Sequence, residues 1–174
     1  FLYLSHYGVH TPIQGKPELV QDYTEKAGTD GHSNPTYAAM IHSVDTSVGR
    51  ILEVLDDLEL ADRTIVILFS DNGGFGPVTS MAPLRGSKGM LYEGGIRVPL
   101  IVRWPTVVPA NTVSDEPVIG LDMFPTILDI TGTPSPEGQV LDGVSLLPLL
   151  SGREPLVQRD LFWHFPAYLQ ADDS

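Results

Sequence analysis

The chain has 174 residues, of which 42% are hydrophobic and 18% are charged. This composition is typical of a globular protein, because a disordered chain needs low hydrophobicity and high charge. The formal net charge of -12 argues against a nucleic-acid-binding protein, which would need a basic face. The sequence has no cysteine, which excludes disulfides, thiolate metal ligands and thiol nucleophiles within these residues.

No uninterrupted apolar run approaches the ~18 residues that a membrane-spanning helix needs, and we expect no membrane partner. Residues 1–5 have the apolar character of a buried strand from the first position, without a leader or a cap before them. Residues 170–174 follow an aromatic run without any ending signal. We therefore expect both ends to be cut points inside a longer protein.

The hydrophobic pattern of the first 69 residues predicts a strand, a helix and a second strand. The short apolar run 1–5 is typical of a buried strand, and a long polar loop follows over 6–34. Apolar residues at three- and four-residue spacings predict a helix from Pro35 to about Leu58, with Asn34 as its N-cap. Residues 64–69 form the next strand, so the order predicts a βαβ unit with parallel strands.

The rest of the chain continues this alternation after a Gly-rich stretch over 71–95 that has no periodicity. We expect a strand over 98–104, which starts late because of Pro99. A helix should follow from Asp122, its cap, to about Thr131, and Gly132 should end it. A helix over 145–150 and a last strand over 160–165 complete the expected elements. The predicted fold class is α/β, with a mostly parallel sheet flanked by helices, in one domain that is incomplete at both ends.

Polar side chains follow the first two predicted strands, at the point where each strand ends. His6 and His10 follow the strand 1–5, whereas Asp71 and Asn72 follow the strand 64–69. Because the carboxyl ends of parallel strands share one edge of a sheet, where ligands bind, we expect these two groups to meet there.

The Asp71-Asn72-Gly73-Gly74 segment offers a carboxylate and an amide carbonyl, hard oxygen donors that suit Ca²⁺ or Mg²⁺. An ordinary Asp-Asn-Gly turn after a strand would have the same sequence. Both interpretations stay open on local sequence alone.

Two cations lie in a flexible segment further on, since Arg85 and Lys88 are flanked by Gly86 and Gly89. Backbone N–H groups freed by glycine, together with these side chains, would bind an oxyanion such as phosphate or sulfate. A solvated basic loop is the alternative.

His10 could act as a metal ligand or as the proton donor to a leaving group, although a loop histidine is often only a surface residue. We expect three further histidines, His32, His42 and His164, to be structural or solvated.

Taken together, several segments resemble the type I sulfatases, arylsulfatase-like members of the alkaline-phosphatase superfamily. The segments are FLYLSHYGVHTP (1–12), VGRIL (48–52) in the long helix, SDNGG (70–74), PLRGSKGMLYEGGIRVP (83–99), LDGVSL (141–146) and LFWH (161–164). The resemblance spans nearly the whole chain and implies a sulfuric ester hydrolase with the fold of that superfamily.

Carried over residue by residue, the resemblance implies that Asp71 and Asn72 bind an active-site Ca²⁺, with Mg²⁺ as the other option. Lys88 would contact the substrate sulfate and the leaving-group oxygen. His10 would do likewise and protonate the departing alcohol. His6 matches the family less securely and is left out of the site.

Sulfatases use a formylglycine, made from Cys or Ser in a Cys/Ser-x-Pro/Ala-x-Arg motif, which does not occur in these residues. The resemblance therefore implies that 1–174 is the downstream part of the catalytic domain. The N-terminal part with the nucleophile, and most of the C-terminal subdomain, would be absent. We expect the isolated chain to be inactive and to bind metal weakly.

The implied substrate is a small sulfate ester or a sulfated carbohydrate, and the family's habits indicate a periplasmic or secreted enzyme. The sequence does not indicate an oligomeric state. Two alternatives remain: a phosphodiesterase or phosphonate hydrolase of the same superfamily, or a non-catalytic pseudo-sulfatase. Zinc-dependent members of that superfamily tend to have Asp-His where this chain has Asp71-Asn72, and an amide oxygen suits Ca²⁺ better than Zn²⁺.

Overall fold

The computed structural model describes residues 1–166, which form two compact units. The first is built mainly from Phe1–Ala61 and Ile67–Ile101, and the second from Asp62–Val66 and Val102–His164. Over the described residues, no helix combines the length and the apolar character needed to cross a bilayer.

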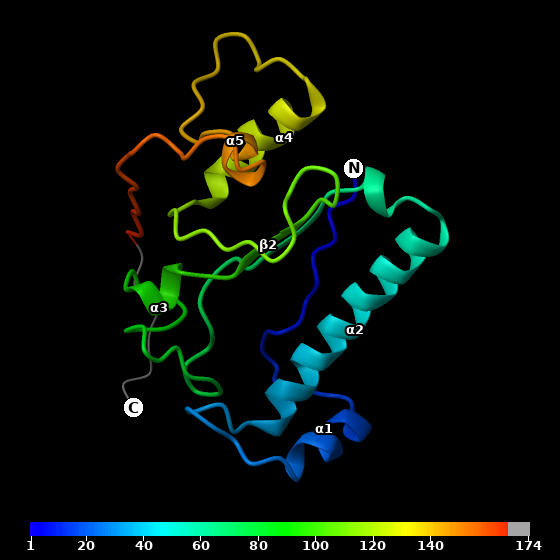
Figure 1. Ribbon diagram of the computed structural model, residues 1–174. Coiled ribbons are helices and arrows are strands. Elements are labelled where there is room, and N and C mark those ends of the chain that lie inside the picture. The colour runs from blue at the N-terminus through cyan, green and yellow to red at the C-terminus, as the bar shows by residue number, and fades with distance from the viewer. Residues whose placement is uncertain (167–174) are drawn as a thin grey trace. The chain divides into compact units, whose positions relative to one another are not determined.

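The long helix α2 (Pro35–Asp57) is the main element of the first unit, as Figure 1 shows. Its start is confirmed in detail, because the Asn34 side-chain oxygen accepts a hydrogen bond from the backbone N–H of Tyr37 at 2.9 Å. Pro35 occupies the first helical position, where its missing N–H costs nothing. Asn34 therefore fixes where the loop before α2 ends.

A second helix, α1 (Pro17–Thr24), interrupts the predicted loop 6–34, so the prediction of an unbroken loop was wrong. Its start signals are Pro17 in the first turn and the acidic Glu18 beside it. The helix packs on α2 through Tyr23, whose ring meets the ring of His42 edge-on with centroids 5.9 Å apart. Tertiary packing thus supports a helix too short to be stable alone.

The sheet has two strands, β1 (Val66–Phe69) and β2 (Leu100–Arg103), which are shorter than the predicted strands at 64–69 and 98–104. Strand β2 begins after Pro99, as the proline predicts. Beyond the strands, Ser70 N–H bonds to the Pro99 carbonyl and Gly73 N–H to the Gly95 carbonyl. From Ser70 to Gly73 along one segment, the bonded partner moves back from Pro99 to Gly95 along the other. The two segments therefore run antiparallel. A mostly parallel sheet is therefore not confirmed.

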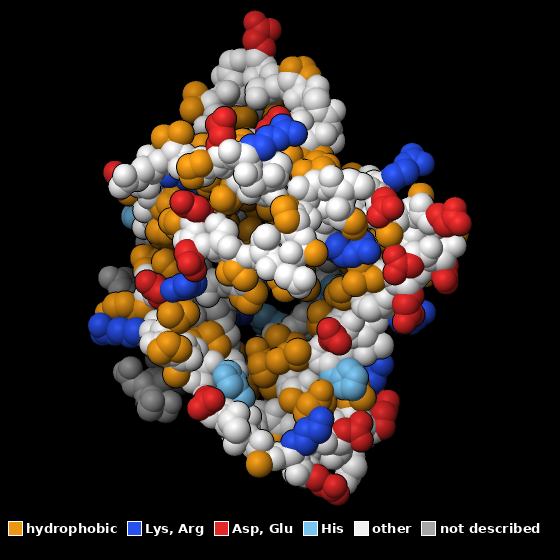
Figure 2. Space-filling view, viewed as in Figure 1, with side chains coloured by type: hydrophobic (Ala, Val, Ile, Leu, Met, Phe, Trp, Pro, Cys, Tyr) orange, Lys and Arg blue, Asp and Glu red, His pale blue; other side chains and the backbone are white. Residues whose placement is uncertain are grey.

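Two predicted strands, 1–5 and 160–165, are wrong, because neither segment is a strand in the structure. Their apolar residues predicted burial, yet Phe1 is 102% exposed and Phe162 is 84% exposed. A strand needs a partner to accept its backbone hydrogen bonds, and no described segment pairs with either one. Figure 2 shows hydrophobic side chains at many places on the face in view.

The second unit contains helix α4 (Met123–Thr131) and the short helix α5 (Leu147–Leu150), which match the predicted helices at 122–131 and 145–150. Gly132 ends α4 in the left-handed conformation with φ 63°, as predicted. The structure also has two 3-10 turns, η1 (Ala61–Arg63) and η2 (Gly120–Asp122).

Asp122 occupies the N-cap position of α4, as predicted, but its side chain makes no capping hydrogen bond to that helix. Its side chain instead accepts hydrogen bonds from the backbone N–H groups of Ile119 and Val144, both at 2.9 Å. The guanidinium of Arg159 adds a bidentate contact, with Nη1 at 2.6 Å from Oδ1. Because these partners satisfy the carboxylate, Asp122 can be fully buried.

The pKa of Asp122 reflects this competition between burial and pairing. Burial alone would raise the pKa, but the hydrogen bond from Arg159 and those from Ile119 and Val144 outweigh it, and the pKa is lowered. A lowered folded-state pKa contributes stability that is present above the unfolded pKa of about 3.9. That contribution is lost as the pH falls through the folded pKa.

We predict that Arg159→Leu lowers the free energy of unfolding by about 3 kcal/mol near neutral pH, because it leaves the buried Asp122 charge without its partner. Urea denaturation measures this loss. Arg153→Leu is the matched control, since Arg153 is exposed, and it should change stability by less than about 0.5 kcal/mol. An Arg159 variant as stable as its control would contradict a stabilising role for the pair.

Candidate functional site

The turn that carries Asp71 and Asn72 and the loop that carries Lys88 are joined through their backbones. The Lys88 N–H donates to the carbonyl of Gly74 at 3.0 Å, and the Gly73 N–H donates to the carbonyl of Gly95 at 2.9 Å. The two segments that sequence analysis singled out for metal and oxyanion binding therefore form one assembly. No side-chain contact is needed to hold them together.

Three glycines make this close approach possible. A Cβ on Gly73 would lie 1.8 Å from the carbonyl oxygen of Gly94, and a Cβ on Gly94 would lie 2.1 Å from that of Gly86. A Cβ on Gly95 would lie 2.0 Å from the carbonyl oxygen of Met90. Since no side chain fits at such distances, glycine is required at all three positions.

Two of these glycines lie in helix α3 (Glu93–Ile96), a single turn that the sequence did not predict. Both Gly94 and Gly95 are buried, and the Gly94 N–H donates to the Arg85 carbonyl at 2.7 Å. The glycine pair was missed as a helix because glycine disfavours helices in general. Glycine occurs here nonetheless because nothing larger than hydrogen fits between the neighbouring loops.

The Asp71 carboxylate is exposed and the Asn72 side chain is half-buried. Asn72 Nδ2 donates to Asp71 Oδ2 at 2.5 Å, which leaves Asp71 Oδ1 and the amide oxygen as donors to a cation. These are hard oxygen ligands, but Ca²⁺ takes six to eight of them. Residues 1–166 hold no cluster of three or more His, Cys, Asp or Glu that could bind a metal. The turn fits a Ca²⁺ site only as a part of its ligand set.

The two predicted cations differ in how they are held. Arg85 lies over the ring of Tyr92, 3.8 Å from the centroid, in a cation–π contact. Lys88 is half-buried, and its backbone is tied to Gly74. The backbone of Lys88 is therefore held beside the Asp71–Asn72 turn, whereas the Arg85 guanidinium is engaged with Tyr92.

His10 is exposed, and its described contacts lie within its own loop. Its Nδ1 donates to the carbonyl of Thr11 at 2.9 Å, and its ring meets the ring of Tyr7 at 5.8 Å between centroids. The argument that brought His10 to Asp71 depended on a strand over 1–5, which the structure lacks. Their meeting therefore stays a prediction.

The loop of His10 runs beside α2. His6 Nε2 and Ser47 Oγ share a hydrogen bond of 2.9 Å, and a Cβ on Gly15 would meet Ala39 at 3.0 Å. The chain thus passes from the middle of α2 towards its N-terminus as it leads from His6 to Gly15. His10 lies between these two attachments.

Of the three histidines that were expected to be structural or solvated, two are within hydrogen-bond distance of a hydroxyl group and the third is exposed. His32 Nδ1 lies 3.0 Å from Thr79 Oγ1, and His42 Nδ1 lies 3.3 Å from the Tyr23 hydroxyl. His164 is exposed.

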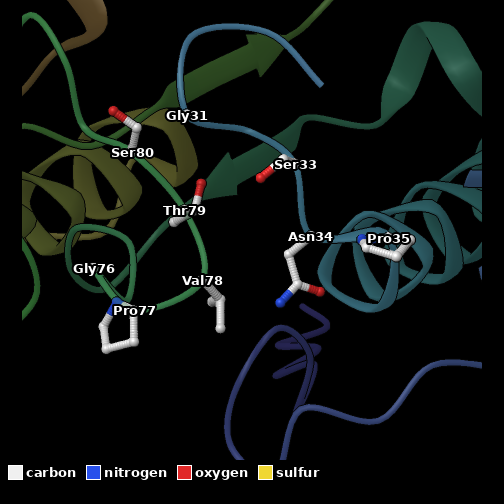
Figure 3. Close-up of a pocket in the computed structure, with 9 residues that line it drawn as sticks. All are labelled: Gly31, Ser33, Asn34, Pro35, Gly76, Pro77, Val78, Thr79 and Ser80. Atoms are coloured by element: carbon white, nitrogen blue, oxygen red, sulfur yellow. The ribbon is translucent and has the colours of Figure 1, made fainter. Parts of the chain in front are cut away.

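The structure adds a cleft of about 520 Å³, formed by residues 31–35 and 76–80, that sequence analysis missed (Figure 3). The first segment follows a tight turn in which Asp30 has φ 52° and Gly31 has φ 83°. The His32 N–H closes this turn on the Thr29 carbonyl at 2.8 Å. An Asp-Gly pair is the usual signal for such a turn, and it was the sequence signal available for this wall of the cleft.

A smaller pocket beside the cleft is lined in part by Tyr37. Burial raises the pKa of the Tyr37 hydroxyl, so this side chain is a neutral phenol at physiological pH.

Comparison with known proteins gives consistent matches over this chain. A protein-family model described as Sulfatase matches residues 1–133. A sulfatase from Formosa agariphila is 40% identical over 97% of this chain, and human steryl-sulfatase is 36% identical over 98% of it. The chain spans 33% and 29% of these two relatives, about a third of their length.

Solved structures give the same picture. The structure of Ps i-CgsB matches 88% of this chain with a TM-score of 0.80 and 36% identity, and the match covers 34% of that chain. Its complex with k-i-k-neocarrahexaose matches 84% of this chain with a TM-score of 0.76 and 35% identity, over 32% of that chain.

We predict that Gly94→Ala separates the two loops, because its methyl group would overlap the carbonyl of Gly86 and the backbone would have to move. The free energy of unfolding should fall by about 1–3 kcal/mol, and trypsin should cleave faster after Arg85 and Lys88. The matched control is Gly49→Ala in α2, where a Cβ meets nothing within 4 Å. The control should be neutral or slightly stabilising, and equal behaviour of both variants would refute the packing argument.

Proposed function

We propose that this chain, which belongs to the sulfatase family, forms the part of a sulfuric ester hydrolase that binds the ester, holds a divalent cation and protonates the leaving group. The observation that supports this proposal is the joining of the Asp71–Asn72 turn to the Lys88 loop through the Gly73, Gly74 and Gly95 backbone. The segment proposed to hold the cation and the segment proposed to bind the oxyanion are neighbours through these backbone bonds.

Asp71 and Asn72 would hold a Ca²⁺ ion, or Mg²⁺, through a carboxylate and an amide oxygen. The bound cation would neutralise charge on the sulfate group and orient it. These two residues supply only part of the six to eight oxygens that Ca²⁺ requires, and the other ligands are proposed to lie outside 1–174. The same holds for the formylglycine nucleophile, because its motif is absent from this sequence.

Lys88 acts as a fixed positive charge in this proposal. Its ammonium group would contact a sulfate oxygen and the ester oxygen, on which negative charge develops as the sulfur–oxygen bond breaks. The hydrogen bond from Lys88 N–H to Gly74 holds the base of this side chain beside the cation ligands.

His10 would provide the proton for the departing alcohol. When the sulfur–oxygen bond breaks, its electron pair passes to the ester oxygen, which takes the proton from Nε2 of the imidazolium. The bond from Nδ1–H to the Thr11 carbonyl leaves Nε2 as the nitrogen that exchanges the proton.

The proposed substrate is a small sulfate ester or a sulfated carbohydrate. The likeness to a structure that holds k-i-k-neocarrahexaose supports the carbohydrate class.

We further propose that the protein acts in the periplasm or outside the cell. Cell fractionation tests this, and recovery of the activity only from the cytosol of spheroplasts would disprove it.

We predict that the complete protein hydrolyses 4-nitrophenyl sulfate with a higher kcat/KM than bis(4-nitrophenyl) phosphate, and that Lys88→Gln lowers the sulfatase kcat/KM by about 10²- to 10³-fold. Lys16→Gln is the control, since Lys16 is exposed in the same unit. Residues 1–174 alone should be inactive. Preference for the phosphate diester would favour the phosphodiesterase alternative, and no activity on either ester would favour the pseudo-sulfatase.

The role of His10 predicts a dependence on the leaving group. His10→Ala should lower kcat/KM by about 10²-fold or more for an alkyl sulfate, whose alkoxide needs a proton, and far less for 4-nitrophenyl sulfate. A series of aryl and alkyl sulfates measures this dependence, with His164→Ala as the control. An equal loss on all leaving groups would exclude His10 as the proton donor.

A further inference from the structure

The cleft between residues 31–35 and 76–80 has a volume of about 520 Å³, within the ~300–1,000 Å³ typical of ligand pockets. None of the residues that line it carries a charge. Its polar groups are the hydroxyls of Ser33, Thr79 and Ser80 and the amide of Asn34, and prolines supply apolar surface. In Figure 3 the Ser33 hydroxyl points towards the side that carries Thr79.

The two walls are held together before any ligand binds. His32 Nδ1 lies 3.0 Å from Thr79 Oγ1. At the turn, a Cβ on Gly31 would lie 2.7 Å from Ser80 Cβ, so the two segments are in close contact. A preformed cleft lowers the entropy cost of binding.

The cleft adjoins the proposed sulfate site. A Cβ on Gly74 would meet Thr79 Cγ2 at 2.7 Å, and a Cβ on Gly76 would meet Ser87 Oγ at 3.1 Å. Gly74 is two residues from Asn72, and Ser87 precedes Lys88. A group bound in the cleft is therefore within reach of the same substrate molecule whose ester lies at Asn72 and Lys88.

The chemistry of the walls selects an uncharged ligand rich in hydroxyl groups. Hydroxyl and amide side chains donate to and accept from such a ligand, whereas a second sulfate or a carboxylate would find no cation among the lining residues. The N-terminus of α2 does not change this, because Asn34 already accepts the Tyr37 N–H. A neutral sugar ring, with hydroxyls at its rim and C–H groups on its faces, fits both kinds of surface.

We propose that this cleft binds an unsulfated sugar ring of an oligosaccharide, adjacent to the ring whose sulfate ester is cleaved. The proposal rests on the proposed function, because it assigns a second part of the same substrate. The preferred substrate would then be a sulfated oligosaccharide, in which the protein recognises one neutral ring beside the sulfated ring.

The test measures kcat/KM of the complete protein on monosulfated monosaccharides and on the matching di- and trisaccharides in which the neighbouring rings are neutral. The panel covers sulfated galactose, fucose, N-acetylglucosamine and N-acetylgalactosamine. For the sugar that the protein cleaves best, the oligosaccharide should exceed the monosaccharide by at least about tenfold. The ratio of the two values cancels differences in enzyme concentration and in sulfate binding.

Ser33→Ala should lower this ratio about five- to tenfold, as the loss of one hydrogen bond predicts, and Ser33→Phe should bring it close to one by filling the cleft. Ser135→Ala, at an exposed serine of the other unit, should leave the ratio unchanged. Unaltered ratios in both Ser33 variants, or no gain from the neutral ring in the wild type, would overturn the proposal. Absence of activity on 4-nitrophenyl sulfate would instead refute the proposed function itself.

Discussion

The contact of Gly94 with the carbonyl oxygen of Gly86 is the constraint on which the proposed site depends. It allows α3 to lie between the Asp71–Asn72 turn and the Lys88 loop, and the backbone hydrogen bonds of Gly73 and Lys88 complete the assembly. Backbone atoms carry this arrangement, so its geometry does not depend on side-chain rotamers. A site that must bind a charged group in a fixed position benefits from such rigidity.

The same assembly connects the cleft of Ser33 and Thr79 to the residues proposed to bind the sulfate group. Gly74 contacts Thr79 on one side and accepts the Lys88 N–H on the other. In the proposed function, this turn of the chain would connect recognition of the ester with recognition of the sugar beside it. A change of sequence at 76–80 would then alter substrate preference while the residues proposed to bind the ester stay as they are.

Local signals in the sequence predicted those elements that local interactions determine. The Asn34 cap and Gly132 fixed the ends of α2 and α4, and the apolar runs located β1 and β2. The runs 1–5 and 160–165 show why the other strands were wrong, because apolar composition predicts burial but does not supply a pairing partner. The sequence placed Asp122 correctly at the N-cap position of α4 but did not give the partners of its side chain, since Val144 and Arg159 lie 22 and 37 residues away.

The candidate site was also predictable only where local sequence signals identify it. Asp71, Asn72 and Lys88 were found from residue type and glycine context, whereas the cleft is formed by segments about 45 residues apart and had no sequence pattern of its own. His10 was placed by a topological argument that required a strand over 1–5. Its loop is positioned instead by contacts of His6 and Gly15 with α2.

The buried position of Gly73 also bears on the chemical ageing of the protein. In an Asn-Gly sequence the glycine nitrogen can attack the side-chain carbonyl of the asparagine, which expels ammonia and forms a cyclic imide. Water then opens the imide and leaves a carboxylate in place of the amide. Here the Gly73 nitrogen is bonded to the Gly95 carbonyl and packed against α3, so it is not free to approach the Asn72 side chain. The packing that brings Asn72 beside Lys88 therefore also protects it from deamidation.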